Sequence, residues 1–213
     1  NDVQAVCDSL VYNTKDSCMT MYRDPIAWSG DRQLLGEEIQ VFMKDSTIDR
    51  AHIINQALTA ELMPDKEHYQ QLSSKEMFAY FTKGQITQTE AIGNVRSIYY
   101  PVDDKDSTLM GLVYIETDTM KMFMRDRQLQ KIWTSKTDGT WYPMTQIPPE
   151  RYKLDGFTWF DYIRPINKDD IYEWRGKKDG TQLKNITRHA APLQHIEGGE
   201  LKSVAATENK PEN

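Results

Sequence analysis

The residues that could carry out catalysis are few and widely spaced in this 213-residue chain. Glu116 and Asp118 stand two positions apart, and on a β-strand this spacing places both carboxylates on one face. Paired carboxylates hydrolyse glycosidic bonds by general acid–base catalysis. The jelly-roll glycoside hydrolases that use such a pair continue to a third acid, and Lys121 stands at the corresponding position here. We therefore expect a protein that is not an enzyme, with a jelly-roll glycoside hydrolase using Glu116 and Asp118 as a less favoured alternative.

The residue pattern gives little support for a metal site or for a catalytic cysteine. An acidic loop near Asp103 lacks the glycine and the distal glutamate of a calcium-binding loop. A cysteine nucleophile would need an activating histidine close by, and none is evident. The four histidines are scattered without metal-ligand spacing: His52, His68, His189 and His195. We expect no cofactor and no bound metal.

The two cysteines, Cys7 and Cys18, lie on either side of a predicted tight turn at residues 13–16. In that hairpin Val11 is opposite Cys18, and Cys7 is opposite Tyr22. The two sulfur atoms are then about four residues apart along the strands, beyond the ~7 Å Cα separation that a disulfide can bridge. The spacing predicts two free thiols.

The bulk composition excludes several classes of partner. The formal net charge is −6 and the sequence pI is about 5.3, with no basic stripe for nucleic acid or for an anionic membrane surface. No apolar stretch approaches the roughly 20 residues that span a bilayer. Hydrophobic residues make up 38% of the chain and the mean hydropathy is −0.70, which suits strands that each bury a single face.

A hairpin pattern recurs along the first two thirds of the chain. Short runs of alternating apolar and polar residues meet tight polar turns near Lys15, Asp45, Lys83 and Asp126. Four such turns at these intervals predict a stacked, quasi-repetitive β architecture.

From residue 146 onward the pattern changes. Pro148 and Pro149 interrupt the strands, residues 150–164 are rich in aromatic side chains, and Asn167 begins a predicted short helix that closes around Gly176. We interpret residues 146–196 as a helical and aromatic cap packed on one end of the sheet stack. The tail, residues 197–213, is expected to be disordered.

One segment of the repeat carries a family resemblance. Glu90-Ala91-Ile92-Gly93-Asn94-Val95, which follows the strand begun by Gln85 and Ile86, resembles the repeat of the OstA/LptA-like family. The residues from Cys7 to Trp28, and Gln33 to Ile39, follow the same pattern. The resemblance implies an all-β fold over residues 1–145, a β-jelly-roll or folded taco of two antiparallel sheets built from repeated hairpins.

The resemblance also implies a function: a periplasmic, non-enzymatic lipopolysaccharide transport or assembly protein that shelters acyl chains between its sheets. Its partners would be lipopolysaccharide acyl chains and other OstA-like modules, joined by sheet-edge pairing. The alternative is a ligand-free structural β-module of an envelope assembly, since a lipid-lining residue and a core residue follow the same pattern. The predicted apolar lining comprises Leu10, Tyr12, Met19, Met21, Ile39, Val41, Met43, Ile86, Val95, Met120, Met122 and Met124.

Overall fold

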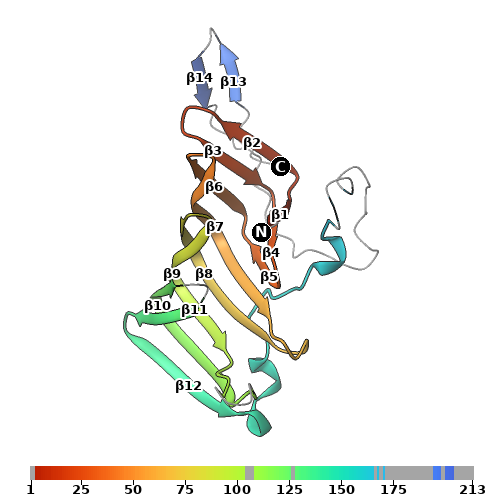
Figure 1. Cartoon of the computed structure of the whole chain (residues 1–213), viewed down its shortest axis with the longest axis vertical. Coiled ribbons are helices and arrows are strands. Elements are labelled where there is room, and N and C mark those ends of the chain that lie inside the picture. The colour runs from red at the N-terminus through yellow and green to blue at the C-terminus, as the bar shows by residue number, and fades with distance from the viewer. Residues whose placement is uncertain are drawn as a thin grey trace, which may run out of the picture. The chain divides into compact units, whose positions relative to one another are not determined.

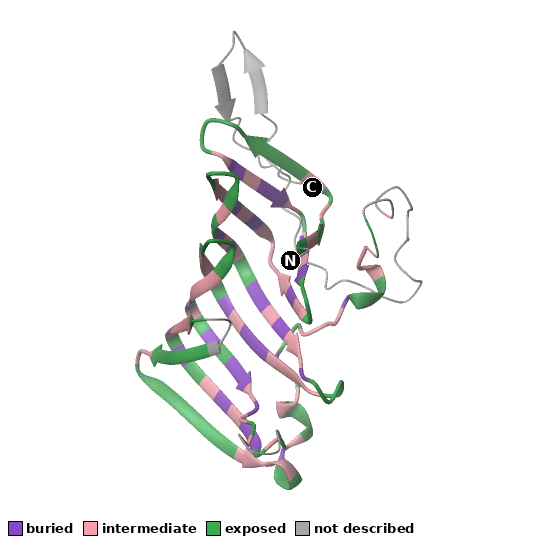
Figure 2. Ribbon diagram, viewed as in Figure 1, coloured by how far each residue is buried: buried purple, intermediate pink, exposed green. Residues whose placement is uncertain are grey.

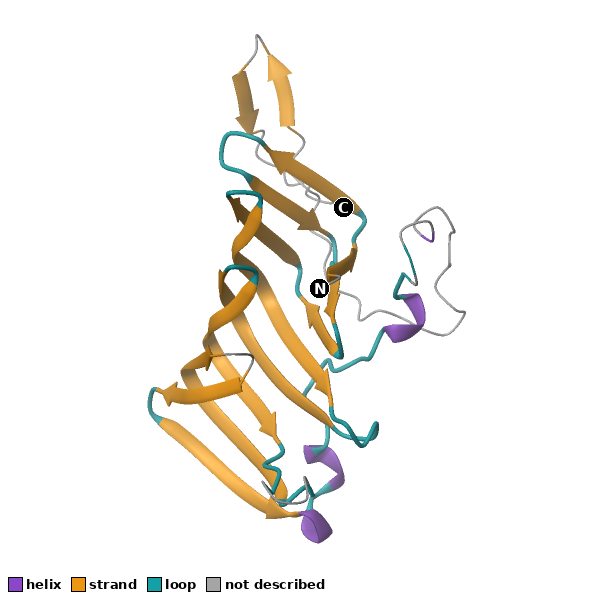
Figure 3. Ribbon diagram, viewed as in Figure 1, coloured by secondary structure: helices purple, strands orange, loops and turns teal. Residues whose placement is uncertain are grey.

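The computed structural model describes residues 3–103, 108–125, 128–165, 167 and 170, and two further short strands, 194–197 and 200–203. Strands dominate the described chain, and its helices are single 3-10 turns (Figure 1, Figure 3). The strands are β1 (Val3–Val6), β2 (Ser9–Asn13), β3 (Cys18–Tyr22), β4 (Ile26–Ser29), β5 (Arg32–Leu35), β6 (Glu38–Lys44), β7 (Thr47–Leu62), β8 (Tyr69–Thr82), β9 (Gln85–Tyr99), β10 (Gly111–Arg125), β11 (Gln128–Thr134), β12 (Thr137–Pro143), β13 (Gln194–Glu197) and β14 (Glu200–Ser203). The 3-10 turns are η1 (Met144–Gln146), η2 (Pro149–Arg151) and η3 (Asp161–Ile163).

Strands β1 to β12 form one antiparallel sheet, and β13 pairs with β14 separately. The four predicted hairpins are confirmed, because β2 pairs with β3, β6 with β7, β8 with β9, and β10 with β11. The predicted all-β fold class is confirmed as well. The two expected sheets, however, are two halves of a single continuous sheet, because the strands from β7 to β10 run through both of them.

Each of these four long strands is irregular near its middle. The register shifts between Ile54 and Ala57 in β7, between Ser73 and Glu76 in β8, and between Thr117 and Thr119 in β10. In β9, Gly93 (φ 81°) and Asn94 (φ 49°) adopt left-handed backbone, and such bulges bend a strand. We call this row of bulges the crease, defined by Asn55–Gln56, Lys75, Gly93–Asn94 and Asp118.

The crease divides the sheet into two half-sheets. The first comprises β2, β3, β6, β11 and residues 47–54, 76–82, 85–92 and 119–125. The second comprises β1, β4, β5, β12 and residues 57–62, 69–74, 95–99 and 111–117. One core cluster contains Ile53, Met77 and Met120 from the first and Leu72 and Val95 from the second, so the half-sheets pack face to face. Buried bands alternate with accessible ones along the central strands (Figure 2).

The segment after β12 is where the cap, residues 146–196, is predicted, and the structure describes mainly its first part. Residues 147–165 cross the outer face of the second half-sheet. Ile147 and Leu154 pack into a second core cluster with Ile98 and Leu112, and farther along Pro165 accepts a hydrogen bond from Gln4 of β1. We call residues 147–165 the strap.

The remaining C-terminal expectations are only partly described. The predicted helix from Asn167 to Gly176 lies largely outside the described residues, as does most of the tail. Within the expected disordered tail, Glu200–Ser203 forms a strand paired with Gln194–Glu197. Contacts divide the chain into two compact units, Asn1–Gly176 and Lys177–Asn213, so the strap belongs to the same unit as the sheet.

Both cysteine thiols are free, as predicted, although the hairpin register differs. Cys18 pairs with Asn13, and Ser9 pairs with Tyr22. The loop lies one residue later than expected, at residues 14–17. The Asn13 side chain organises it, accepting a hydrogen bond from the Lys15 backbone N–H at 3.0 Å and donating to Asp16 at 2.7 Å.

Candidate functional site

The inner face of the first half-sheet consists of three rows of side chains that run across the strands. Burial decreases row by row away from the crease. The crease row is almost completely buried and comprises Met21, Ile39, Ile53, Met77, Ala91 and Met120. The middle row is partly accessible and comprises Met19, Val41, Ala51, Ala79, Thr89 and Met122. The rim row comprises Met43, Ile48, Phe81, Ile86 and Met124, none of which is fully buried.

The two edge strands extend this inner face and leave apolar side chains in solvent. On β2, Leu10 pairs with Met21 and Tyr12 pairs with Met19. Leu10 is 53% exposed and Tyr12 is 52% exposed. On β11, Ile132 pairs with Met122 and is 40% exposed. The apolar inner face is therefore accessible at both of its ends. Burying these side chains would be favourable by about 25 cal/mol per Å² of apolar surface.

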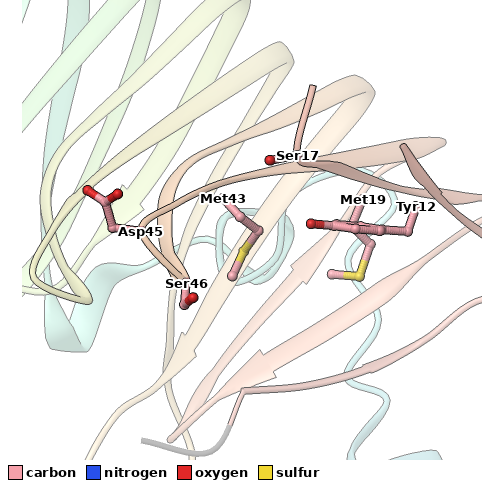
Figure 4. A pocket seen from close by; sticks show the side chains of 6 residues that line it. All are labelled: Tyr12, Ser17, Met19, Met43, Asp45 and Ser46. Atoms are coloured by element: carbon pink, nitrogen blue, oxygen red, sulfur yellow. The ribbon is translucent and has the colours of Figure 1, made fainter. Parts of the chain in front are cut away.

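A pocket of about 340 Å³ opens beside β2 at the hairpin tips. Tyr12, Met19 and Met43 come from three strands, and their side chains lie close together in Figure 4. Asp45 and Ser46 line the same pocket from the turn between β6 and β7. The pocket thus has flexible thioether walls, which adapt to irregular apolar ligands, and a polar margin.

The structure divides the twelve predicted lining residues into three groups. Five are core residues at 8% exposure or less: Met21, Ile39, Val41, Val95 and Met120. Five are half-buried: Met19, Met43, Ile86, Met122 and Met124. Leu10 and Tyr12 are exposed because β2 is an edge strand, paired only with β3 among the described strands. The pocket brings together Tyr12, Met19 and Met43; the other nine do not line it.

The opposing wall belongs to the second half-sheet. Ala27, Leu34 and Ile115 point inward and pack against the same core cluster as the methionines. One pleat farther from the crease, on the same face, Arg32 and Glu61 form an ion pair at 2.9 Å and are both more than one-third exposed. The inner face of this wall therefore changes from apolar near the crease to charged near its margin. Alternation predicts the apolar part, but which residues face each other depends on the crease.

Glu116 and Asp118 lie together with Arg96, Lys136 and Asp138 in an outer groove of about 350 Å³ beside the crease. Glu116 accepts a hydrogen bond from the Tyr114 hydroxyl at 2.8 Å and lies 3.6 Å from the Arg96 guanidinium. Burial raises the pKa of Tyr114, and its hydrogen bond to Glu116 raises this pKa further. Glu116 is about half-exposed, as an ion-paired surface carboxylate would be.

Two other site classes find no support in the part of the chain that the structure describes. That part contains no group of three or more His, Cys, Asp or Glu side chains able to hold a metal ion. None of its helices is long and apolar enough to cross a membrane.

Comparisons with known proteins show similarity at the level of structure and not of sequence. No protein-family model matches the chain, and no curated protein sequence matches it. Among solved structures, the chain is similar to LptH from Pseudomonas aeruginosa, the LptA-homologous periplasmic component of the lipopolysaccharide transport device. The TM-score is 0.46 and the identity 10%, over 61% of this chain and 80% of LptH. A similarity of this degree carries no functional argument, so the function must be argued from the residues of the chain itself.

Proposed function

We propose that this chain is a non-enzymatic carrier module of the cell envelope that binds acyl chains of a lipopolysaccharide-type lipid along the inner face of its first half-sheet. One observation carries the proposal: the methionine-rich inner face remains accessible along its rim row and at both edge strands. The crease row forms a closed floor, and the acyl chains would lie against the middle and rim rows.

Three further features support this proposal. The OstA/LptA-like segment Glu90–Val95 contains the bulge that bends β9, so the resemblance lies in residues that produce the folded sheet. Among the described strands, β1, β2, β11 and β12 each pair with one neighbour, which leaves a second edge at either end of the sheet. Such edges can pair with a neighbouring module, and residues 147–165 of the strap cross an outer face. The proposal includes a periplasmic location, which rests on the resemblance to the OstA/LptA-like family.

A ligand-free structural module is the second candidate. The observation in its favour is that five of the twelve predicted lining residues are already packed between the half-sheets at 8% exposure or less. Such residues form a core without any ligand. The two candidates differ in the rim row, which only the carrier would cover with lipid.

A charged substitution in the pocket distinguishes the carrier from the ligand-free structural module. In the carrier, Met43→Asp places a carboxylate against an acyl chain, which is unfavourable because the charge loses hydration. We expect lipopolysaccharide to bind the purified Met43→Asp variant at least about tenfold more weakly than wild type, a change of ~1.4 kcal/mol. Displacement of a fluorescent fatty-acid probe measures this. Gln40→Asp, on the outer face of the same strand, is the matched control and should bind like wild type. No binding by wild type, or equal binding by all three proteins, would exclude the carrier.

A further inference from the structure

The strap is held to the second half-sheet by a row of three glutamines. Gln4, Gln33 and Gln71 lie on β1, β5 and β8, and they belong to one row across the sheet, which also contains Trp28 and Ala60. Gln33 and Gln71 are 0% and 2% exposed, an unusual environment for uncharged polar side chains unless they are hydrogen-bonded.

Each glutamine binds the strap through both atoms of its side-chain amide. Gln71 donates to the Tyr152 carbonyl and accepts from the Leu154 N–H, both at 2.8 Å. Gln33 donates to the Thr158 carbonyl at 2.8 Å and accepts from the Phe160 N–H at 2.7 Å.

The last contact of the row lies at the sheet edge. Gln4 donates to the Pro165 carbonyl at 2.7 Å and accepts from the Arg164 Nε–H at 2.6 Å. Arg164 also donates to the Gly30 carbonyl at 2.8 Å, which ties the strap to the turn between β4 and β5. The three contacts recur about every six residues, so the strap is fixed along its length and not at one point.

The strands under the second half of the strap need outside support. β1, β4 and β5 have four residues each, and β5 joins the rest of the sheet through only four residue pairs with β7. In the first half-sheet, β6 joins β7 through seven pairs. Backbone pairing between strands therefore holds β1, β4 and β5 less firmly than it holds β6. Local opening occurs where such contacts are few.

The same short strands belong to the wall opposite the methionine pocket, which is the pocket lined by Tyr12, Met19 and Met43. Gln33 points outward to the strap, and its neighbour Leu34 points inward and packs against the same core cluster as Met19 and Met43. Gln71 and Leu72 repeat this arrangement on β8. Because successive side chains of a strand point to opposite faces, a strand held from outside by glutamine has its inner side chain held as well.

We propose that the strap acts as a splint, which fixes β1, β4 and β5 and thereby holds the wall opposite the methionine pocket in place. The splint carries its own cost, because Trp28 Nε1 and Tyr100 Oη are buried near it without a hydrogen-bond partner in the described chain. Loosening the strap would let both groups bind water, which lowers the free-energy cost of release. The splint controls lipid capture only if the proposed carrier function holds.

Hydrogen exchange of the full chain tests the splint without any ligand. Gln33→Leu leaves the Thr158 carbonyl and the Phe160 N–H without their partner, and Gln4→Leu is a milder variant at a half-buried position. We expect exchange in residues 26–29 and 32–35 to rise at least about tenfold in Gln33→Leu, with unchanged exchange in β3 and β6. Gln4→Leu should raise exchange in residues 3–6 and 26–29. The control is Gln40→Leu on the other half-sheet, where the Gln40 amide donates to Glu38.

Two results would overturn the splint. One is unchanged exchange in β1, β4 and β5 in both variants. The other is an equal rise in β3 and β6, which would show a general loss of stability. Binding of the fluorescent fatty-acid probe is the second measurement: it should weaken in Gln33→Leu and not in Gln40→Leu. A wild-type protein that binds no probe refutes the carrier function alone, because the exchange result judges the splint independently.

Discussion

The two half-sheets share four continuous strands, but their outer faces differ in how far they are exposed to water. The first half-sheet buries Cys18 and Thr20 of β3 on its outer face. The rest of this face carries polar and charged pairs, such as Lys121–Glu90 at 2.7 Å and His52–Glu76 at 3.0 Å. The second half-sheet has an outer face rich in buried apolar side chains, including Trp28 and Leu112, and requires the strap to cover it. Each of the four long strands therefore has an open outer surface on one side of the crease and a covered one on the other.

This difference explains why stability and proposed function lie in different regions. The second half-sheet buries side chains on both faces, so it resembles the middle layer of a three-layer domain. The first half-sheet has a buried crease row, a middle row in which Val41, Ala51 and Thr89 are buried, an accessible rim row and a largely polar outer face. A protein that must admit a flexible ligand benefits from keeping one wall accessible and the other firmly packed.

The largest expected effect contrasts two aromatic side chains on the two outer faces. Trp28 is 1% exposed in the second half-sheet, and Trp28→Ala should lower the free energy of unfolding by about 3–5 kcal/mol. Phe78 is half-buried in the first half-sheet, where it stacks on His52 at 4.1 Å, and Phe78→Ala should cost less than about 2 kcal/mol. Urea denaturation measures both, and equal losses would remove the distinction between the faces.

Alkaline pH should destabilise the protein through Tyr100, which is 1% exposed. Burial, with the nearby Tyr152 and Asp65, raises the pKa of Tyr100 from 10.0 to about 12. The stabilisation is fully present below pH 10 and is lost as the pH rises toward 12, by roughly 2–3 kcal/mol at most.

Two variants check this assignment. In Tyr100→Phe, the part of the alkaline loss due to Tyr100 should disappear, and stability at neutral pH should not fall, because the hydroxyl has no partner. Tyr80→Phe, on the outer face of the first half-sheet, should keep the wild-type profile in pH-dependent urea denaturation. A wild-type profile in Tyr100→Phe would show that Tyr100 is not the group responsible.

The passage between the half-sheets should be sensitive to a single methyl group. A Cβ added at Gly36, between β5 and β6, would lie 2.5 Å from Ile53 Cγ2, so Gly36→Ala should cost about 1–3 kcal/mol through overpacking. At Gly139 on β12 the nearest atom would be 3.8 Å away, and Gly139→Ala should change stability by less than about 0.5 kcal/mol. Thermal unfolding of both variants measures the difference; a neutral Gly36→Ala would show that this close approach relaxes freely.

The smallest effect concerns the solvated face of the first half-sheet. Lys121→Met removes the ion pair with Glu90 and the cation–π contact with Trp133 at 5.9 Å. The expected loss is no more than about 1 kcal/mol, and the difference from wild type should shrink in 1 M NaCl because salt screens the pair. A loss as large as that of Trp28→Ala would contradict the assignment of this face as solvated.

Local pattern was sufficient to predict the hairpins. The polar turns at Lys15, Asp45 and Lys83 are flanked by alternating residues, and pairing across a tight turn depends only on neighbours in the sequence. The shared inner face of Leu10, Tyr12, Met19 and Met21 followed from the same alternation, but their pairing did not, because the turn lies one residue later than predicted. The exposure of Leu10 and Tyr12 did not, because an edge strand is defined by the absence of a further strand.

The crease and the strap could not be predicted from local pattern. Gly93 and Asn94 were recognisable as a motif, but their role as a bend becomes visible only when Asn55 and Asp118 lie in line with them across the sheet. The three strap glutamines are spread over 67 positions, from Gln4 to Gln71. Nothing in their immediate sequence distinguishes them from solvent-exposed glutamines, since their partners are backbone groups more than 80 residues away.

The most direct test of the carrier account is photo-cross-linking in living cells of a Gram-negative host. A photoreactive amino acid is placed at Met43 or Met122 on the inner face, and at Gln40 or Lys121 on the outer face of the same strands. The account predicts that lipopolysaccharide is captured from the two inner positions and not from the two outer ones. Absence of capture at both inner positions, or equal capture at all four, would contradict it.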